Sequence, residues 1–309
     1  MADWTEIKIE VPAREVDRAG DIASMAVPYG IYVEDYRNLE AEAMEIAKID
    51  LIDEELLAKD RTKGIVHIYI SPEENPAEVI SFLRERFESE QIDYRIDESL
   101  CKNEDWENNW KKYFKPMPVG ERLLIHPIWE QEYDAGGRCV IHLEPGLAFG
   151  SGTHDTTRLC LESVEKYAYP GKTMLDVGCG SGILSVSALL LGADSAVGVD
   201  IDALAVKTAV ENGETNGFTE PQYRVIKGSL TDNVTGKYDI IAANIVADIV
   251  VKLCDDVKNF MNKDAVFITS GIIVPRENDV LEAFAKNGLK VIGRYESGGW
   301  LCFEVKADE

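Results

Sequence analysis

The sequence lacks the features that mark disulfide-rich, zinc-binding and membrane-spanning proteins. Its 309 residues include six cysteines without a C-x-x-C pair or regular spacing, so we expect neither a disulfide framework nor a structural zinc site. Reduced thiols in a cytosolic protein fit this pattern better. No apolar run approaches the roughly 18 residues that a membrane span needs. Met1 leads into acidic sequence without a basic segment, which predicts that there is no signal peptide.

Basic residues are also scarce. The chain has 32 Lys and Arg against 56 Asp and Glu, a net charge of −24 at pH 7. Phosphate backbones repel such a chain, which argues against direct nucleic-acid binding and favours a basic partner. Residues 1–110 hold 28 acidic and 12 basic side chains, and therefore 16 of the net negative charges. This asymmetry predicts a separate N-terminal module with its own partner, and a role in solubility alone explains the acidity equally well.

The first hundred residues predict a small α+β domain. Hydrophobic spacing and turn residues indicate, in chain order, a strand at 5–11, a helix at 16–26, a strand at 31–34, a strand at 65–70, a helix from 76 and a strand at 92–96. Asn75 as N-cap and Pro76 at the first helical position mark the start of the second helix. This order is that of the ferredoxin-like split βαβ fold. The acidic stretch 39–60 receives no assignment.

Residues 104–118 predict a linker helix. Trp106, Trp110 and Phe114 recur every four residues, so one face of this helix is aromatic. We interpret these rings as fixing the linker against a domain, and an interaction surface is the alternative. The two prolines that follow end the helix.

From residue 119 the pattern becomes larger and more regular. Two strands, at 123–126 and 139–143, precede a series of alternating strands and helices. The series has strands at 173–177, 196–200, 223–226, 238–242 and 265–270 and helices at 183–191, 203–212, 249–260 and 276–287. Such alternation predicts a doubly wound, mostly parallel sheet. The last two strands, at 289–295 and 300–305, are so close in sequence that they must be antiparallel.

The stretch MLDVGCGSGIL carries the clearest chemistry. A strand ends at Asp176, and the glycines that follow make a tight turn into a helix. These glycines, Gly178, Gly180 and Gly182, lie where a ligand must approach the backbone so closely that a Cβ would collide. Asp200 ends the next strand, where a carboxylate can accept both hydroxyls of a ribose. The alternative is a glycine-rich turn without a ligand.

The spacing of this motif separates two classes of cofactor. It is G-x-G-x-G preceded by an acid, whereas dinucleotide-binding enzymes use G-x-G-x-x-G. A pyrophosphate requires a helix N-terminus without nearby carboxylates. A sulfonium cofactor that carries an α-amino group is compatible with Asp176. The motif therefore favours a methyl donor.

At these residues the chain resembles the S-adenosylmethionine-dependent methyltransferases with a Rossmann-like fold, whose seventh strand is antiparallel. The stretch PGLAFGSGTHDTT, at 145–157, is similar to the signature loop of the ribosomal protein L11 methyltransferases (PrmA-type). That family usually has TGT and a proline where this chain has SGT and Asp155. The stretch ANIVA, at 243–247, resembles the family's ANILA, with Val246 for leucine. The linker DWENNWKKYFKP is also typical of the family.

The resemblance implies an architecture and an activity. It implies a Rossmann-like seven-stranded methyltransferase domain at 119–309 and a smaller ferredoxin-like domain at 1–103 that recognises the substrate. The expected function is N-methylation, by S-adenosylmethionine, of lysine and/or N-terminal amines of the basic ribosomal protein L11 in the cytoplasm. We expect a monomer without a metal, a membrane contact or direct nucleic-acid contact.

The positions of these residues, together with the resemblance, suggest a role for each. Gly178 lies under the methionine part of the cofactor, Asp200 holds the ribose, and Thr157 donates to the methionyl carboxylate. Helix capping by Thr156 or Thr157 is the alternative. Asn244 accepts a hydrogen bond from the incoming amine, and a turn-forming asparagine is the alternative. The expected cofactor-binding set is Thr157, Asp176, Gly178, Gly180, Gly182, Asp200 and Asn244, and the expected catalytic residue is Asn244.

Other candidates are weaker. His154 either contacts substrate or orders the backbone of its loop. Cys179 has no visible base partner, so we assign it no nucleophilic role. The turn before Trp300 is either a substrate-side turn or a hairpin with a core tryptophan. The three histidines on predicted strands are interpreted as structural: His67, His126 and His142.

The sequence is also compatible with three other functions. One is a methyltransferase of the same fold that acts on a small amine or another protein. The second is a nicotinamide-dependent dehydrogenase, against which the glycine spacing argues. The third is a non-catalytic factor that binds a ribosomal protein.

Overall fold

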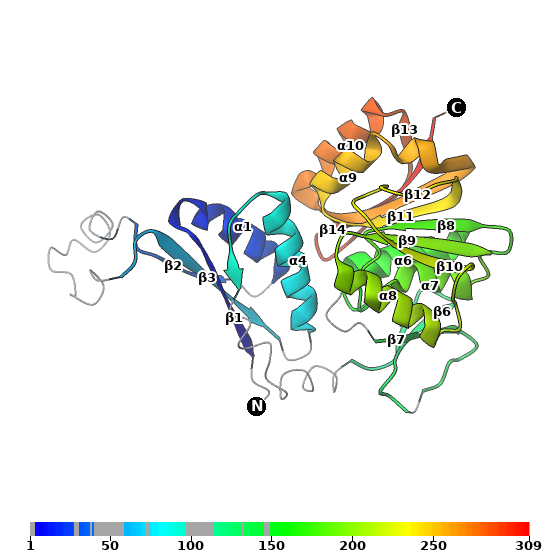
Figure 1. The fold of residues 1–309 in the computed structure, drawn as a ribbon, viewed down its shortest axis with the longest axis horizontal. Coiled ribbons are helices and arrows are strands. Elements are labelled where there is room, and N and C mark those ends of the chain that lie inside the picture. The colour runs from blue at the N-terminus through cyan, green and yellow to red at the C-terminus, as the bar shows by residue number, and fades with distance from the viewer. Residues whose placement is uncertain are drawn as a thin grey trace. The chain divides into compact units, whose positions relative to one another are not determined.

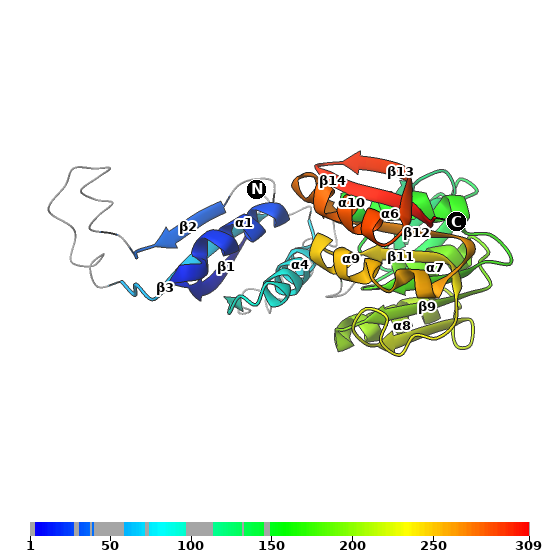
Figure 2. The same ribbon diagram turned by 90° about the horizontal axis from the view of Figure 1, so that it is seen from above.

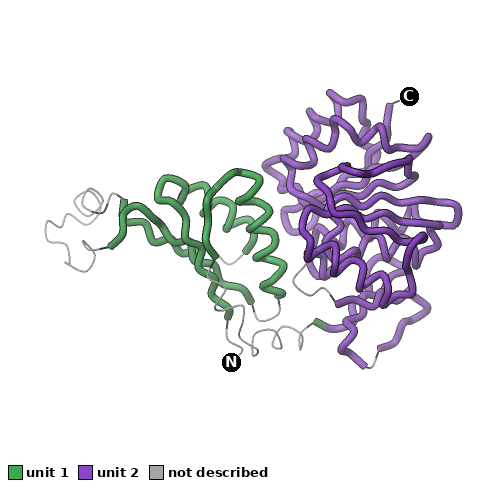
Figure 3. The backbone as a smooth tube through the Cα atoms, in the orientation of Figure 1, with its two compact units in different colours: residues 1–114 green, residues 115–309 purple. Residues whose placement is uncertain are grey.

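The chain divides into two compact units, Met1–Phe114 and Lys115–Glu309, as Figure 3 shows. The computed structural model describes residues 4–27, 31–37, 39, 59–71, 74–96, 114–131, 133–144 and 149–308. Most of the acidic stretch 39–60, most of the predicted linker helix and the start of the signature loop lie outside these ranges. In the part of the chain that is described, no helix has the length and apolarity to cross a membrane.

The N-terminal unit has the predicted ferredoxin-like topology (Figure 1). Its elements are β1 (Thr5–Pro12), η1 (Ala13–Glu15), α1 (Val16–Ala26), β2 (Ile31–Asp35), β3 (Lys63–Ile70), α4 (Pro76–Ser89) and β4 (Arg95–Ile96). The strands pair in the order β2-β3-β1-β4, and every neighbouring pair is antiparallel. Asn75 caps α4 as predicted, because its Oδ1 accepts the N–H of Ala77 at 3.0 Å.

One strand of this unit is shorter than predicted. The sequence predicts a strand over 92–96, but β4 contains Arg95 and Ile96 alone. The N–H of Ile92 donates to the carbonyl of Phe87 at 2.9 Å, so it closes the end of α4 and does not pair with β1. The ring of Tyr94 packs on the ring of Phe87, with centroids 5.1 Å apart. These contacts with α4 compete with strand pairing.

The second unit contains a seven-stranded sheet in the order β10-β9-β8-β11-β12-β14-β13 (Figures 1 and 2). Its strands are β8 (Thr173–Val177), β9 (Ser195–Asp200), β10 (Tyr223–Lys227), β11 (Tyr238–Asn244), β12 (Met261–Ile273), β13 (Leu289–Ser297) and β14 (Trp300–Ala307). β14 runs antiparallel to both of its neighbours, and the neighbouring pairs from β10 to β12 are parallel. The predicted doubly wound sheet with an antiparallel terminal pair is confirmed.

The helices of this unit are α6 (Asp155–Tyr167), α7 (Ile183–Leu190), α8 (Ala203–Thr215), α9 (Ala247–Cys254), η4 (Val257–Phe260), η5 (Val274–Arg276) and α10 (Glu277–Lys286). The prediction of one continuous helix over 249–260 is wrong. Asp255 and Asp256 bond to carbonyls three residues back, so α9 tightens and ends there. Two adjacent aspartates with low helix propensity explain this break. β12 is also longer than the predicted 265–270 at both ends.

The two predicted early strands form a separate, smaller sheet. β6 (Leu123–Pro127) and β7 (Cys139–Leu143) are parallel, and β5 (Met117–Val119) pairs antiparallel with β6. The predicted linker helix extends to residue 118, but residues 117–119 form β5, because proline at 118 is tolerated on an edge strand. β7 is the other edge strand of this sheet.

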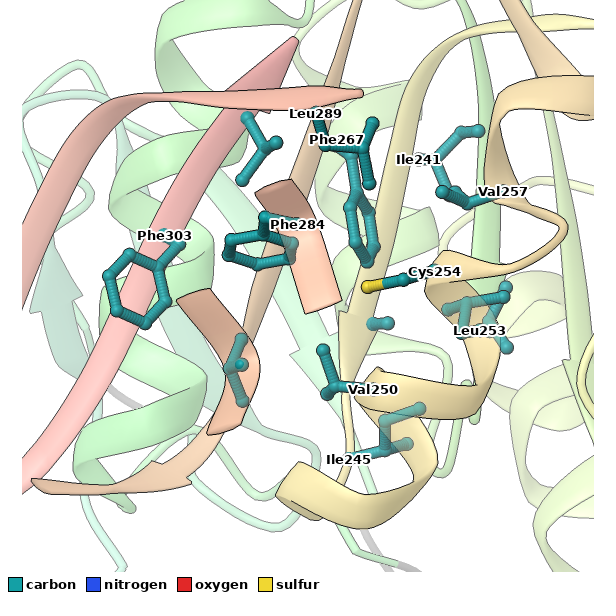
Figure 4. Close-up of a cluster of buried hydrophobic side chains, with 14 of the residues drawn as sticks. Ile241, Ile245, Val250, Leu253, Cys254, Val257, Phe267, Phe284, Leu289 and Phe303 are labelled. Carbon is teal, nitrogen blue, oxygen red and sulfur yellow. The ribbon is translucent and has the colours of Figure 1, made fainter. Parts of the chain in front are cut away.

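Alternating residues of β14 face opposite sides of the large sheet. Phe303 packs with Phe284 of α10, whose ring also contacts Phe267 of β12 (Figure 4). Glu304, the next residue, bonds to Lys166 of α6 at 2.7 Å. α6 and α10 therefore cover opposite faces of the sheet. The face that α6 covers is the one that carries the site.

Candidate active site

The candidate site lies where the strand order of the sheet reverses, between β8 and β11. Open α/β sheets bind ligands at such a point, outside the carboxyl ends of the strands. Asp176 lies opposite Gly198 of β9 and Ala242 of β11. Because side chains alternate along a strand, Asp200 and Asn244, two residues further on, face the same side as Asp176. The sheet therefore brings the three predicted polar residues to one face and one edge.

The glycine turn is enclosed by other parts of the protein. Gly180 has a φ of +52°, and a Cβ on it would lie 2.4 Å from the carbonyl oxygen of Phe149. Gly178 has a φ of +70°, and its Cβ would lie 2.4 Å from Cγ2 of Ile245. The sequence explains these glycines by the approach of a ligand, and the structure adds close packing of the protein itself. Gly182 is the N-cap of α7.

The carboxylate of Asp200 is fixed by backbone donors. The N–H of Gly180 donates to Oδ2 and that of Asp202 donates to Oδ1, both at 2.9 Å. Burial raises the pKa of this carboxyl above its ordinary value, and these N–H donors oppose the shift. Each oxygen has a second lone pair. The side chain can therefore accept two ligand hydroxyls without giving up its backbone contacts.

Asp176 is fully buried and held through one of its two oxygens. Oδ2 accepts the backbone N–H of Ser185 at 3.2 Å and its hydroxyl at 2.8 Å. Oδ1 has no partner among the described residues. Burial raises the pKa of the carboxyl to about 7. A buried oxygen of this kind fits the amino group of a ligand.

Thr157 and Asn244 are brought into contact from 87 residues apart. Nδ2 of Asn244 donates to Oγ1 of Thr157 at 3.3 Å, and both side chains are buried. Within the described ranges, Oδ1 of Asn244 has no partner. The neighbouring N-cap of α6 is His154, whose Nδ1 accepts the N–H of Thr156 at 3.3 Å. Neither threonine caps the helix, so the capping alternative does not account for Thr157.

His154 also links the site to the end of the chain. Its ring contacts the rings of Phe149 and Trp300, with centroids 5.8 and 5.1 Å apart. Trp300 begins β14, directly after the hairpin turn. The sequence left two roles open for His154, and the structure shows that it orders the start of α6.

Sequence reasoning missed Ser185, Ser181 and Asn212. Ser185 supplies both hydrogen bonds to Asp176, and Ser181 and Asn212 bond to each other at 2.9 Å. The available signal was the run of small polar residues in and after the glycine turn. Buried positions in the glycine turn, α7 and α8 accept such residues at low cost only when they have hydrogen-bond partners.

Two other groups have structural roles. Cys179 is buried, and burial raises the pKa of its thiol well above the ordinary value, so it remains protonated. His126 and His142 lie side by side on β6 and β7, with their Nδ1 atoms 3.2 Å apart. In the described part of the chain, no three His, Cys, Asp or Glu side chains are placed to hold a metal ion.

Comparisons with known proteins show which family the chain is similar to. The family model described as "Ribosomal protein L11 methyltransferase (PrmA)" matches residues 3–308. Curated proteins named "Ribosomal protein L11 methyltransferase" from Clostridium perfringens (strain SM101 / Type A) and Acetivibrio thermocellus are 37% and 35% identical, over 98% of each chain. A solved ribosomal protein L11 methylase from Lactobacillus delbrueckii subsp. bulgaricus is 31% identical. It superposes with a TM-score of 0.59 and covers 64% of this chain and 100% of its own.

Proposed function

The chain belongs to the ribosomal protein L11 methyltransferase (PrmA) family, and from that premise we propose that it transfers methyl groups from S-adenosylmethionine to amines of ribosomal protein L11. The observation that carries the proposal is the pairing of Asn244 with Thr157. Among the described residues it leaves one buried amide oxygen without a partner, on the same face of the sheet as Asp176 and Asp200.

The polar residues at this edge of the sheet can each bind one part of the cofactor. We assign the ribose hydroxyls to Asp200, the amino group to Oδ1 of Asp176, and the methionyl carboxylate to Thr157. Gly178 and its neighbours in the turn provide backbone against which the cofactor lies. When bound, S-adenosylmethionine supplies a methyl group on a sulfonium, which becomes a neutral thioether when an amine attacks the methyl carbon.

Asn244 orients the acceptor. A lysine or N-terminal ammonium first loses a proton to water, because a neutral lone pair is required for attack. Oδ1 of Asn244 then accepts one remaining N–H of the amine and directs the lone pair at the methyl group. Positioning of this kind can contribute about 7–11 kcal/mol to lowering a barrier. The Thr157 contact holds the amide in the orientation that presents its oxygen.

The N-terminal unit is the proposed recognition element for a basic protein. One face of its sheet packs on α1 and α4, and the other face carries Tyr32 and Tyr69, which are 54% and 37% exposed. On the same face His67 lies between two carboxylates, with Nδ1 2.9 Å from Glu6 and Nε2 3.0 Å from Glu34. Residues 40–58 of this unit add seven acidic side chains against one basic. Aromatic rings and acidic groups together suit a basic partner.

The test is methyl transfer by the purified chain. Ribosomal protein L11 and a panel of small amines are incubated with labelled S-adenosylmethionine, and products are analysed by intact-mass and peptide mass spectrometry. We expect methylated lysine or N-terminal amines on L11 and none on the small amines. Transfer to small amines alone would indicate a different acceptor, and binding of L11 without transfer would indicate a non-catalytic factor.

A matched pair of variants tests the cofactor assignment. Asp200→Ala should weaken S-adenosylmethionine binding by about 1.5–3 kcal/mol, the range for hydrogen bonds to a charged group. Asp200→Asn retains an acceptor for Gly180 and controls for disruption of the turn. If calorimetry shows that Asp200→Ala binds S-adenosylmethionine with unchanged affinity, the assignment of Asp200 to the ribose is wrong.

A further inference from the structure

Asn212, in the last turn of α8, and Asn216, the residue directly after α8, bond to the outer edge of β7 and to the residue that follows it. Oδ1 of Asn216 accepts the N–H of His142 at 2.9 Å, and its Nδ2 donates to the carbonyl of His142 at 2.6 Å. Oδ1 of Asn212 accepts the N–H of Glu144 at 3.0 Å. Residues 142 and 144 present their N–H groups on the same edge of the strand. The two side chains thus occupy the place where a further strand would pair.

Asn212 makes a second contact that Asn216 does not make. Its Nδ2 donates to the carbonyl of Ser181, in the glycine turn, at 2.9 Å. Ser181 is fully buried and uses its remaining polar groups on the other loop. Its N–H donates to the carbonyl of Phe149 at 2.8 Å, and its hydroxyl donates to that of Gly150 at 2.6 Å.

These contacts connect the residues on both sides of the stretch 145–148 to Ser181. Glu144 precedes residues 145–148 and is connected to Ser181 through Asn212. Phe149 and Gly150 follow that stretch and bond to Ser181 directly. The loop that leads to Thr157 and the glycine turn are therefore held to each other at two points.

We propose that Asn212 is a positioning residue for S-adenosylmethionine binding, because it sets the spacing between the glycine turn and the loop that leads to Thr157. The inference rests on the proposed function, in which both segments contact the same ligand. Two loops that share a ligand must be held within a fraction of an ångström of the binding geometry. Asn212 is 1% exposed, so no solvent replaces its contacts when they are lost.

The test compares Asn212→Ala with Asn216→Ala. Both variants lose bonds between the end of α8 and residues 142–144, and both should lower the melting temperature. Asn212→Ala also leaves the buried carbonyl of Ser181 without its donor and should raise the Kd for S-adenosylmethionine about tenfold or more. Asn216→Ala should leave that Kd within about twofold of the wild type. Calorimetric titration with S-adenosylmethionine and thermal unfolding give the two readouts.

Each outcome decides between positioning and general stability. Equal Kd changes in the two variants, or an unchanged Kd in Asn212→Ala despite a lower melting temperature, would overturn the inference. Should Asn212→Ala not fold, Asn212→Asp decides, because it keeps an acceptor for the N–H of Glu144 and removes only the donor to the carbonyl of Ser181. It should raise the Kd about threefold or more, and an unchanged value would overturn the inference. A wild-type chain that does not bind S-adenosylmethionine would overturn the proposed function as well.

Discussion

Asp176 and Asn244 are each held through one polar atom and leave the other without a partner among the residues that the structure describes. Leaving a buried polar atom unpaired costs about 1–3 kcal/mol. A ligand that supplies the missing partner recovers this free energy on binding. The same feature therefore weakens the cofactor-free protein and strengthens the complex.

The raised pKa of Asp176 gives a pH-dependent prediction. Because the folded pKa is about 7 and the ordinary value is 3.8, the folded state keeps a proton that the unfolded state releases. Stability from this group is therefore lost as pH rises from about 4 to 7. Asp176→Asn removes this dependence. The unfolding free energy of Asp176→Asn minus that of the wild type should therefore increase by about 2–3 kcal/mol from pH 5 to pH 8.

Urea unfolding of both cofactor-free proteins at the two pH values measures this difference. A constant difference would mean that Asp176 is already ionised at pH 5. The folded Asp176→Asn protein should also bind S-adenosylmethionine more weakly than the wild type, because the negative partner of the amino group is gone.

Asn244→Ala tests the proposed acceptor contact. The variant should lower kcat about 100-fold or more, since loss of one positioned polar group often has this effect. Its Kd for S-adenosylmethionine should change much less, because the proposed bond is to the acceptor amine. Single-turnover methylation and calorimetry separate the two quantities. Turnover near the wild-type rate would mean that Asn244 only forms the turn and does not orient the acceptor.

Among the elements, the β13–β14 hairpin is joined to the start of α6. Gly298 and Gly299 have φ values of +56° and +82°, which suits a two-residue turn of type I′. The hydroxyl of Ser297 donates to Oδ1 of Asp155 at 2.9 Å. A Cβ on Gly298 would lie 2.1 Å from Oδ2 of the same aspartate. The turn and the first residue of the helix are therefore packed directly on each other.

A double-mutant cycle measures this connection. Asp155→Ala and Ser297→Ala should each lower the unfolding free energy, and their effects should couple by about 0.5–1.5 kcal/mol, the usual net value of one hydrogen bond. Urea unfolding of the two single variants, the double variant and the wild type gives the coupling. Strictly additive effects would show that the contact does not stabilise the hairpin.

The whole molecule consists of two units that each contain a buried core. The second unit holds the seven-stranded sheet and every proposed cofactor contact. Residues 1–114 carry 14 of the 24 net negative charges. Catalysis and attraction of a basic substrate are therefore divided between the units in our proposal.

A chain that begins at Lys115 tests this division. It should fold and bind S-adenosylmethionine with the affinity of the full chain. Electrostatic steering can raise association rates about 10- to 1,000-fold and weakens with salt. The full chain should therefore show a salt-sensitive kcat/KM on L11, and the truncated chain should be slow and much less salt-dependent.

Light scattering of the truncated protein is the control, since aggregation would imitate a loss of activity. A monodisperse truncated protein that methylates L11 at the full rate would show that the N-terminal unit does not recognise the substrate.

The sequence by itself determined the elements and their class. Hydrophobic periods and glycine positions locate the βα series, the terminal hairpin and the end of β9 at Asp200. Asn75 likewise marks the start of α4, because capping depends on neighbouring residues along the chain. Signals of this kind act over a few residues, so they can be read before the chain is folded.

The tertiary structure alone decided which distant groups meet. The contact of Asn244 with Thr157, the bond of Asn212 to Ser181 and the bond of Ser185 to Asp176 depend on strand register and helix packing. Contacts with α4 also shortened β4, because Ile92 and Tyr94 bond to or pack on Phe87 and do not pair with β1. Burial and hydrogen bonding across many residues have no local sequence signature, because their free energy exists only when the elements are packed together.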